Sequence, residues 1–130
     1  MPDLTNLEGL LVEDEPDLTD LLTFVLQEAG AKIIHVDTIK GALKVLREQP
    51  LDFLVSDLKF SDSNGYTLLK KVRAGETTLN QNIPAIALTA YTREFEKSLA
   101  IAAGFQEFLP KPVNPNELIA AIRQIITESN

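Results

Sequence analysis

The stretch LEGLLVEDEPD, residues 7–17, contains the pattern that decides the predicted fold. Its apolar run at residues 10–12 indicates a short buried strand, which stops at the three adjacent acidic residues 13–15. Pro16 follows, and proline is favoured in the first turn of a helix because its fixed backbone angle suits that position. A strand, an acidic turn and a helix in this order predict one β–α unit with carboxylates at the end of its strand.

Short apolar runs of the same kind recur along the chain. They are nearly continuous, as expected for parallel strands that are covered on both faces of a sheet. We predict strands at Gly9–Val12, Lys32–Val36, Phe53–Ser56, Ala85–Thr89 and Glu107–Leu109.

Longer stretches with a helical period lie between these runs. Leu18, Leu22 and Leu26 are four residues apart, which places them on one face of a helix. Thr38 and Asn114 stand at positions where their side chains favour a helix cap. We predict helices from Pro16 to just before Gly30, at Thr38–Glu48, at Tyr66–Arg73 after an Asn64–Gly65 turn, at Thr92–Ala103, and at Asn114–Glu128.

The alternation of strands and helices predicts the fold class. It is typical of an α/β protein with a doubly wound parallel sheet, because right-handed crossovers place helices on both faces. We expect a flavodoxin-like (βα)5 fold with the strand order 2-1-3-4-5. The 130 residues are expected to form one domain with its core at about residues 8–128. Phe24, Phe53, Phe105 and Leu109 are predicted to lie in the core.

Composition excludes several classes of function. The net charge of −7 argues against binding to nucleic acid or an anionic membrane, which require a basic surface. The chain has no cysteine, so neither disulfides nor thiolate metal sites are possible. No apolar run approaches the roughly 20 residues that span a bilayer, and the N-terminus lacks a basic signal-peptide start. A cytoplasmic location is expected.

Polar side chains stand at the ends of four predicted strands. Glu13 and Asp14 follow the first strand, Asp57 follows the third, Thr89 ends the fourth, and Lys111 follows the fifth. The carboxyl ends of neighbouring parallel strands meet at one edge of a sheet, so these groups are expected to share a cleft. Each of them alone is open to an ordinary interpretation, such as a helix cap at Asp14 or a turn at Asp57.

Carboxylates so close together repel one another by a few kcal/mol, on the order given by an effective dielectric near 20. Either one of them takes up a proton or a cation lies between them. Mg²⁺ prefers oxygen ligands, and the chain offers no cysteine and only one histidine, His35. We predict a site for Mg²⁺ (or Mn²⁺). His35 closes the second strand and is interpreted as a strand-end residue away from the cleft, not as a phosphorelay histidine.

These groups are those that phosphoryl transfer requires. A metal ion and Lys111 neutralise charge on the phosphoryl oxygens, and Thr89 donates a hydrogen bond. A carboxylate can attack phosphorus and form an aspartyl-phosphate. Asp57 is the best candidate nucleophile, because it ends a long apolar strand that holds its backbone rigidly.

Four motifs together resemble the receiver domain of two-component response regulators over nearly the whole chain. They are LLVEDEPD at 10–17, VSDLKFSDSNGY at 55–66, IPAIALTAY at 83–91 and FLPKP at 108–112. The resemblance implies that Asp57 accepts a phosphoryl group from the phosphohistidine of a sensor histidine kinase or a histidine phosphotransfer protein. It also implies that Asp14 binds the metal directly, Glu13 mostly through water, and Lys59 through its backbone carbonyl.

The resemblance further implies a switch. Thr89 and Lys111 contact the phosphoryl oxygens, the Lys111–Pro112 bond is cis and aims the lysine inward, and Phe108 turns inward when Thr89 moves. Phosphorylation then changes the face formed by the fourth helix, fifth strand and last helix, where an effector domain or protein binds. Tyr91 is either a shield for the phosphate or a surface aromatic.

Two alternatives stay open. The chain is either a phosphoacceptor or a receiver-like interaction module that works without phosphorylation. A dehalogenase-type phosphatase is disfavoured, because Lys59 stands where a second acid is needed. As it stands, the sequence predicts self-catalysed phosphoryl acceptance and dephosphorylation but no stand-alone enzyme. Histidine kinase activity is expected only if the chain belongs to a hybrid sensor kinase.

Overall fold

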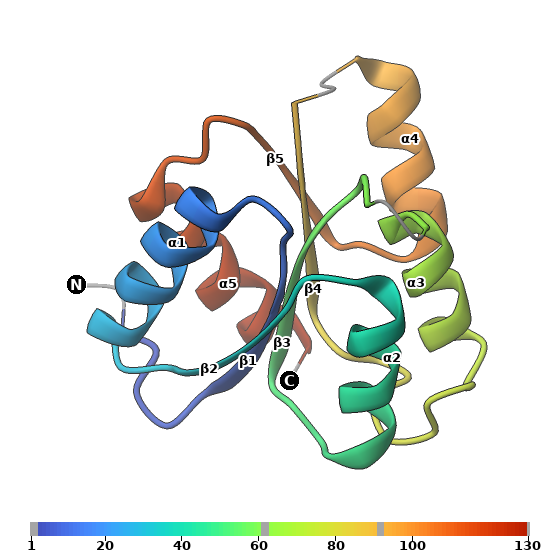
Figure 1. Ribbon diagram of the computed structural model, residues 1–130, viewed down its shortest axis with the longest axis horizontal. Helices are drawn as coiled ribbons and strands as arrows, with labels where there is room; N and C mark the ends of the chain where they lie inside the picture. Colours follow the sequence, from blue (N-terminus) through green and yellow to red (C-terminus); the bar gives the residue numbers. More distant parts are fainter. Residues whose placement is uncertain (1–2, 61–62, 91–92, 130) are drawn as a thin grey trace.

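A computed structural model describes residues 3–60, 63–90 and 93–129 and contains a five-stranded parallel sheet between two layers of helices (Figure 1). The strand order is β2-β1-β3-β4-β5, which confirms the predicted topology. The strands are β1 (Glu8–Val12), β2 (Lys32–Val36), β3 (Phe53–Asp57), β4 (Ala85–Thr89) and β5 (Glu107–Pro110).

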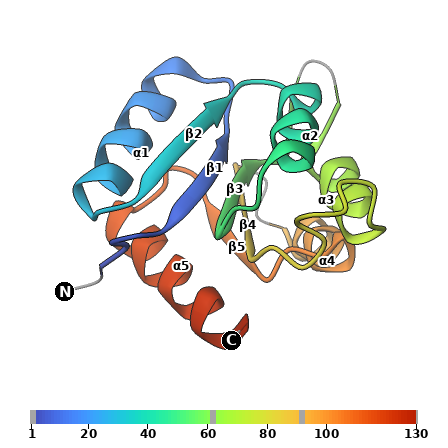
Figure 2. The ribbon, with the colours of Figure 1, turned by 90° about the horizontal axis from the view of Figure 1, so that it is seen from below.

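The helices cover both faces of the sheet, as predicted for a doubly wound fold. Viewed from below, α1 and α5 lie on one side, and α2, α3 and α4 lie on the other (Figure 2). The helices are α1 (Pro16–Glu28), α2 (Ile39–Glu48), α3 (Gly65–Arg73), α4 (Glu94–Ala103) and α5 (Pro115–Ser129).

The helix ends confirm most of the predicted capping signals. Thr38 accepts a hydrogen bond from the backbone N–H of Gly41 at 3.0 Å, and Asn114 accepts one from Asn116 at 2.9 Å. Gly104 follows α4 with φ of 116°, a left-handed conformation that favours glycine. These contacts satisfy backbone groups that have no partner within the helix.

Helices α2 and α5 begin one residue after the predicted Thr38 and Asn114, which cap them, and the starts of α3 and α4 also differ from the prediction. Asn64 was expected to form a turn, but it caps α3 by accepting a hydrogen bond from the N–H of Thr67 at 2.9 Å. Helix α3 therefore begins at Gly65, one residue earlier than predicted. Helix α4 begins at Glu94, and the predicted start at Thr92 lies outside the described residues.

The core has two parts, one on each face of the sheet. The cluster under α1 and α5 includes Leu11, Leu22, Phe53 and Val55, and the cluster under α2, α3 and α4 contains Phe105 among others. Phe53 and Phe105 are buried as predicted, and Leu109 is partly buried against the α1–α5 cluster.

The prediction for Phe24 is wrong, since its side chain is 62% exposed. The buried stripe of α1 passes through Leu22 and Leu26. A residue midway between two positions of one helical face points away from that face, because successive residues are about 100° apart. Phe24 therefore faces solvent.

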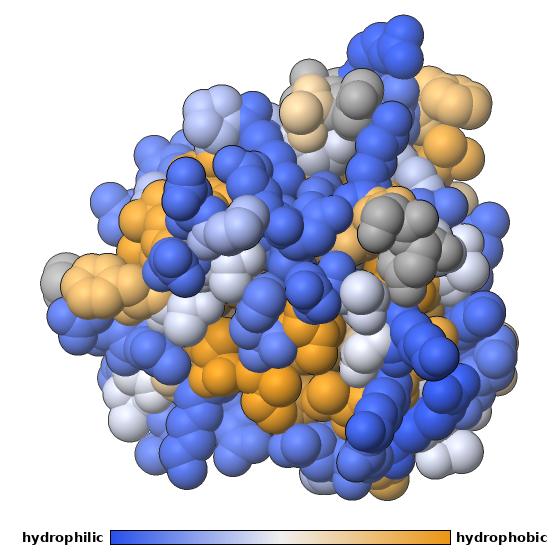
Figure 3. Space-filling view, viewed as in Figure 1, coloured by the Kyte–Doolittle hydropathy of each residue, from blue (hydrophilic) through white to orange (hydrophobic). Residues whose placement is uncertain are grey.

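Phe24 is one of several hydrophobic side chains that are exposed on the helices. Figure 3 shows apolar surface over α1 and over α4. The exposed side chains there include Leu21 and Phe24 on α1 and Phe95, Leu99 and Ile101 on α4. In the described part of the chain, no helix has both the length and the apolar character that a bilayer-spanning segment needs.

Candidate functional site

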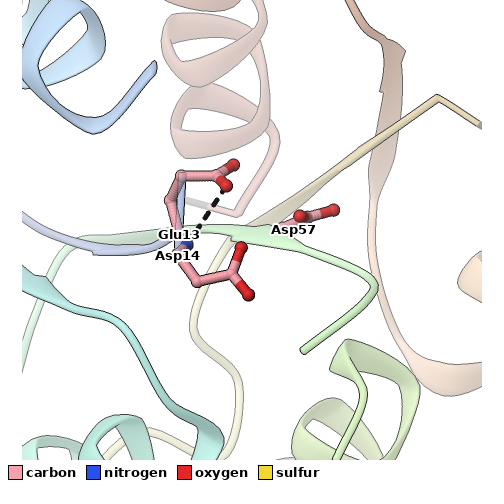
Figure 4. Close-up of side chains that lie close together, drawn as sticks. All are labelled: Glu13, Asp14 and Asp57. Carbon is pink, nitrogen blue, oxygen red and sulfur yellow. Dashed lines mark hydrogen bonds between the residues drawn. The ribbon is translucent and has the colours of Figure 1, made fainter. Parts of the chain in front are cut away.

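The acidic groups meet where β1 and β3 end. The strands pair in parallel, with Val12 opposite Ser56, so the residues that follow them come out side by side. One carboxylate oxygen from each of Glu13, Asp14 and Asp57 lies within 4.8 Å of the others (Figure 4). Within the described residues, no other group of three metal-binding side chains is this close together.

Glu13 has no exposed surface, and its two carboxylate oxygens have different partners. Its Oε2 accepts hydrogen bonds from the backbone N–H groups of Asp14 and Glu15, both at 3.1 Å. Its Oε1 lies 3.2 Å from Lys111 Nζ as an ion pair, but accepts no directed hydrogen bond from the described residues. Burial raises the pKa of Glu13, and the charge of Asp57 raises it further. The positive charge of Lys111 therefore does not fully offset the burial of Glu13 and the repulsion from Asp57.

Asp57 is held by hydrogen bonds at both carboxylate oxygens. Its side chain is nearly buried, its Oδ1 accepts the backbone N–H of Leu58 at 2.7 Å, and its Oδ2 accepts Lys111 Nζ at 3.0 Å. Burial alone lowers the pKa of Lys111, but the hydrogen bond and charge of Asp57 and the charge of Glu13 outweigh it and raise the pKa. Lys111 is thus an ammonium shared between two carboxylates.

The donor set fits a hard divalent cation. Three carboxylates lie together here, and the one ammonium beside them, that of Lys111, is shared between Asp57 and the buried Oε1 of Glu13. Asp14 is exposed, which leaves the site open on one side. Mg²⁺ is bound by one or two carboxylates and keeps several waters, so it suits a site that is acidic and partly open.

Gly65 permits the chain to pass close to Asp57. A Cβ atom at residue 65 would lie 2.6 Å from the carbonyl oxygen of Asp57, closer than non-bonded atoms approach. The N–H of Gly65 also donates to Leu58 O at 3.1 Å, which closes the loop after β3. The spacing of eight residues between Asp57 and Gly65 therefore has a steric reason.

The other predicted site residues lie around this cleft. Thr89 is buried at the end of β4, and its backbone carbonyl accepts the N–H of Lys111 at 2.8 Å. Phe108 is half-buried against the cluster under α2, α3 and α4. Lys59 is exposed and forms an isolated bridge with Asn64.

The Lys111–Pro112 peptide bond is cis. Tyr91, which was interpreted as a shield or a surface aromatic, lies outside the described residues.

His35 and Thr19 contact the site although the sequence did not indicate it. His35 was expected to lie away from the cleft, but its Nε2 is 2.8 Å from the backbone oxygen of Glu13. Thr19 Oγ1 lies 3.5 Å from the same oxygen. Strand pairing places His35 opposite Leu11, on the face that α1 covers. Only the register between β1 and β2 reveals this contact.

Comparison with known proteins agrees with this geometry. The sequence profile of the response regulator receiver domain matches residues 10–123. The chain therefore belongs to the response regulator receiver domain family. It is a receiver domain of the two-component type.

Curated relatives differ in how much of their length the chain spans. It is 40% identical over 124 residues to an uncharacterized 14.6 kDa protein in the sodA1 3′ region of Leptolyngbya boryana, covering 95% of this chain and 93% of that protein. It is 36% identical over 121 residues to the transcriptional regulatory protein CpxR of Escherichia coli K12, covering 93% of this chain and 50% of CpxR. The chain thus spans about half the length of this second relative.

Solved structures share the fold. A putative response regulator from Chloroflexus aurantiacus superposes with a TM-score of 0.86 at 29% identity, over 93% of this chain and 98% of that one. The receiver domain of a sensor histidine kinase from Pseudomonas aeruginosa PAO1 superposes with a TM-score of 0.84 at 27% identity, with the same coverage, and that structure has a magnesium ion coordinated in its active-site cleft.

Proposed function

We propose that Asp57 accepts a phosphoryl group from the phosphohistidine of a partner protein. The observation that supports this most directly is the carboxylate of Asp57, held 3.0 Å from Lys111 Nζ and within 4.8 Å of oxygens of Glu13 and Asp14. A nucleophile, a fixed positive charge and an oxygen-rich ligand set are the parts that phosphoryl transfer to a carboxylate requires.

The transfer exchanges one bond for another. A carboxylate oxygen of Asp57 attacks phosphorus and forms an O–P bond, while the N–P bond of the phosphohistidine breaks and the imidazole leaves with the electron pair. Lys111 neutralises charge on the phosphoryl oxygens, and Thr89 donates a hydrogen bond to one of them.

Glu13, Asp14, Asp57 and the backbone carbonyl of Lys59 would hold the metal. Mg²⁺, or Mn²⁺, supplies positive charge against the phosphoryl oxygens when it is bound there. Asp14 is a direct ligand in this proposal, and the longer side chain of Glu13 acts mostly through water.

Phosphorylation is read on the face formed by α4, β5 and α5. In this proposal Thr89 moves toward the phosphoryl group, and Phe108 turns into the space that Thr89 leaves. Thr89 and Phe108 lie on neighbouring strands, since β4 pairs with β5. A change at the site thus passes to the face where an effector domain or protein binds.

Receiver domains interact with histidine kinases or phosphotransfer proteins. For this chain we propose one receiver domain over residues 1–130, with its core at about 8–128, acting in the cytoplasm with such a partner. It binds neither nucleic acid nor membrane in this proposal. A receiver-like module that binds partners without phosphorylation is the alternative, and the following experiment separates the two.

The test is the intact mass of the protein after incubation with acetyl phosphate, with Mg²⁺ or with EDTA. We expect one added phosphoryl group in the parent only with Mg²⁺, and none in Asp57→Asn. Asp37→Asn is the control, because Asp37 likewise stands at the end of a strand but is exposed, and this variant should behave as the parent. Equal modification of parent and Asp57→Asn, or none in the parent, contradicts the proposal.

A further inference from the structure

The backbone carbonyl of Glu13 is bonded by side chains from outside the acidic loop. His35 Nε2 lies 2.8 Å from this oxygen. Thr19 Oγ1 lies 3.5 Å from the oxygen and 3.4 Å from the same ring nitrogen. Because a carbonyl oxygen only accepts hydrogen bonds, Nε2 of His35 carries the proton that it donates.

The peptide group between Glu13 and Asp14 is thereby held at both of its ends. Its carbonyl accepts the hydrogen bond from His35, and its N–H donates to Glu13 Oε2 at 3.1 Å. A donor on the carbonyl polarises the peptide, which makes its N–H a stronger donor to the carboxylate. The same peptide joins the first two of the three acidic residues that follow β1, so its orientation constrains the directions of both side chains.

Strand β2 supplies a second restraint on Glu13. The N–H of Glu13 donates to the backbone oxygen of Val36 at 3.1 Å, and Val36 is the neighbour of His35. Main-chain pairing thus holds the N–H of Glu13, and the imidazole of His35 holds its carbonyl oxygen. Strand pairing alone leaves the carbonyl of Glu13 free to rotate away.

We propose that His35 is a positioning residue of the metal site. Its hydrogen bond fixes the Glu13–Asp14 peptide and so pre-orients the carboxylates of Glu13 and Asp14 toward Asp57. The inference rests on the proposed function, in which these carboxylates bind Mg²⁺. His35 acts through Glu13 and touches neither the metal nor the phosphoryl group.

A role in folding alone does not account for the contact. His35 is exposed at the end of the edge strand β2, so its removal leaves no buried cavity. What is lost is a donor to one backbone oxygen beside two metal ligands. Partners that orient metal ligands typically change metal affinity by about 10- to 100-fold when they are removed.

The test compares His35→Leu, which has no donor, with His35→Gln, whose amide nitrogen can replace Nε2. Magnesium affinity is measured by isothermal titration calorimetry with MgCl2, and the melting temperature is measured without metal. We expect the dissociation constant of His35→Leu to rise about 10-fold. We expect His35→Gln to stay near the parent, and both melting temperatures to stay close to that of the parent.

Two kinds of result overturn the proposal, one in magnesium affinity and one in thermal stability. One is an unchanged magnesium affinity in His35→Leu, or an equal loss in His35→Gln. The other is a loss of affinity that is matched by a comparable loss of thermal stability, which indicates a purely structural role. Asp14→Asn distinguishes a failure of the proposed metal site from a failure of the role of His35. If the parent binds Mg²⁺ no better than Asp14→Asn, the proposed metal site itself fails, and the role of His35 fails with it.

Discussion

The ammonium of Lys111, which follows β5, lies 3.0 Å from Oδ2 of Asp57, which ends β3. The same nitrogen is 3.2 Å from Glu13 Oε1. One positive charge therefore faces the buried carboxylate of Glu13, which follows β1, and the nearly buried carboxylate of Asp57 at the end of β3. This arrangement makes the site acidic as a whole while keeping the proposed nucleophile in contact with a cation.

Replacing Lys111 by Met is expected to slow phosphorylation by acetyl phosphate by about 10²-fold or more, since a preorganised charge on the phosphoryl oxygens is lost. The rate is measured by intact mass at several times with saturating Mg²⁺. Lys32→Met is the control, because Lys32 is exposed at the start of β2, away from the cleft. A Lys111→Met rate close to that of Lys32→Met contradicts the role of Lys111.

Glu13→Gln is expected to make the metal-free protein more stable relative to the parent as pH rises. Burial and the charge of Asp57 raise the pKa of Glu13, so the folded parent binds this proton more tightly than the unfolded chain. Stability that depends on it is present at low pH and is lost as pH rises through the folded pKa.

Urea unfolding of parent and Glu13→Gln in EDTA, from pH 4 to pH 8, checks this. The free energy of unfolding of Glu13→Gln minus that of the parent should increase as pH rises. Each unit by which the pKa is raised corresponds to about 1.4 kcal/mol. If this difference in unfolding free energy stays constant or decreases as pH rises, Lys111 fully compensates the charge of Glu13.

Magnesium is expected to stabilise the parent against unfolding. A ligand that binds only the folded state adds about 2.7 kcal/mol at a free concentration 100 times its dissociation constant. Asp14→Asn loses a carboxylate of the cluster and should gain much less. The measurement is urea unfolding with MgCl2 and with EDTA, and equal gains in both proteins place the ion elsewhere.

Gly65→Ala is expected to lower the free energy of unfolding by about 1–3 kcal/mol, because the new Cβ overlaps the carbonyl oxygen of Asp57. The backbone at Gly65 or Asp57 must move to relieve that contact. Gly41→Ala is a useful control, since the nearest atom to its new Cβ is the Thr38 hydroxyl at 3.1 Å. Urea unfolding of the two variants gives both free energies. An equal loss in Gly65→Ala and Gly41→Ala would mean that the backbone after β3 moves at little cost and would contradict the steric role of Gly65.

Phe24→Ser is expected to change the free energy of unfolding by no more than about 0.5 kcal/mol, as is usual for surface substitutions. The reason is the exposure of Phe24 on α1. Phe53→Leu should destabilise the protein by about 1 kcal/mol, because Phe53 is fully buried. A large loss in Phe24→Ser would indicate that this side chain is covered in solution.

Local signals made most of the fold predictable. Pro16, Thr38 and Asn114 mark helix starts through backbone geometry and capping, which depend on a few neighbouring residues. The convergence of Asp57 and Lys111 followed from one topological rule, that strand ends of a parallel sheet share an edge.

Other features depend on contacts between distant segments. Phe24 is an exception, because its place midway between Leu22 and Leu26 in the helical period already puts it off the buried face of α1. The contact of His35 with Glu13 depends on the register of β1 and β2. The complete burial of Glu13 likewise depends on where Lys111 reaches from the far end of the chain.

The division of the core by the sheet has a further consequence. Thr19 belongs to the α1 layer, whereas Phe108 packs on the opposite layer with α2, α3 and α4. Substitutions in the first layer can tune how readily the acidic loop is prepared, without altering the side chains that surround Phe108. In the proposed mechanism, the preparation of the acidic loop and the movement of Phe108 are thus open to separate adjustment during evolution, although both meet at Asp57.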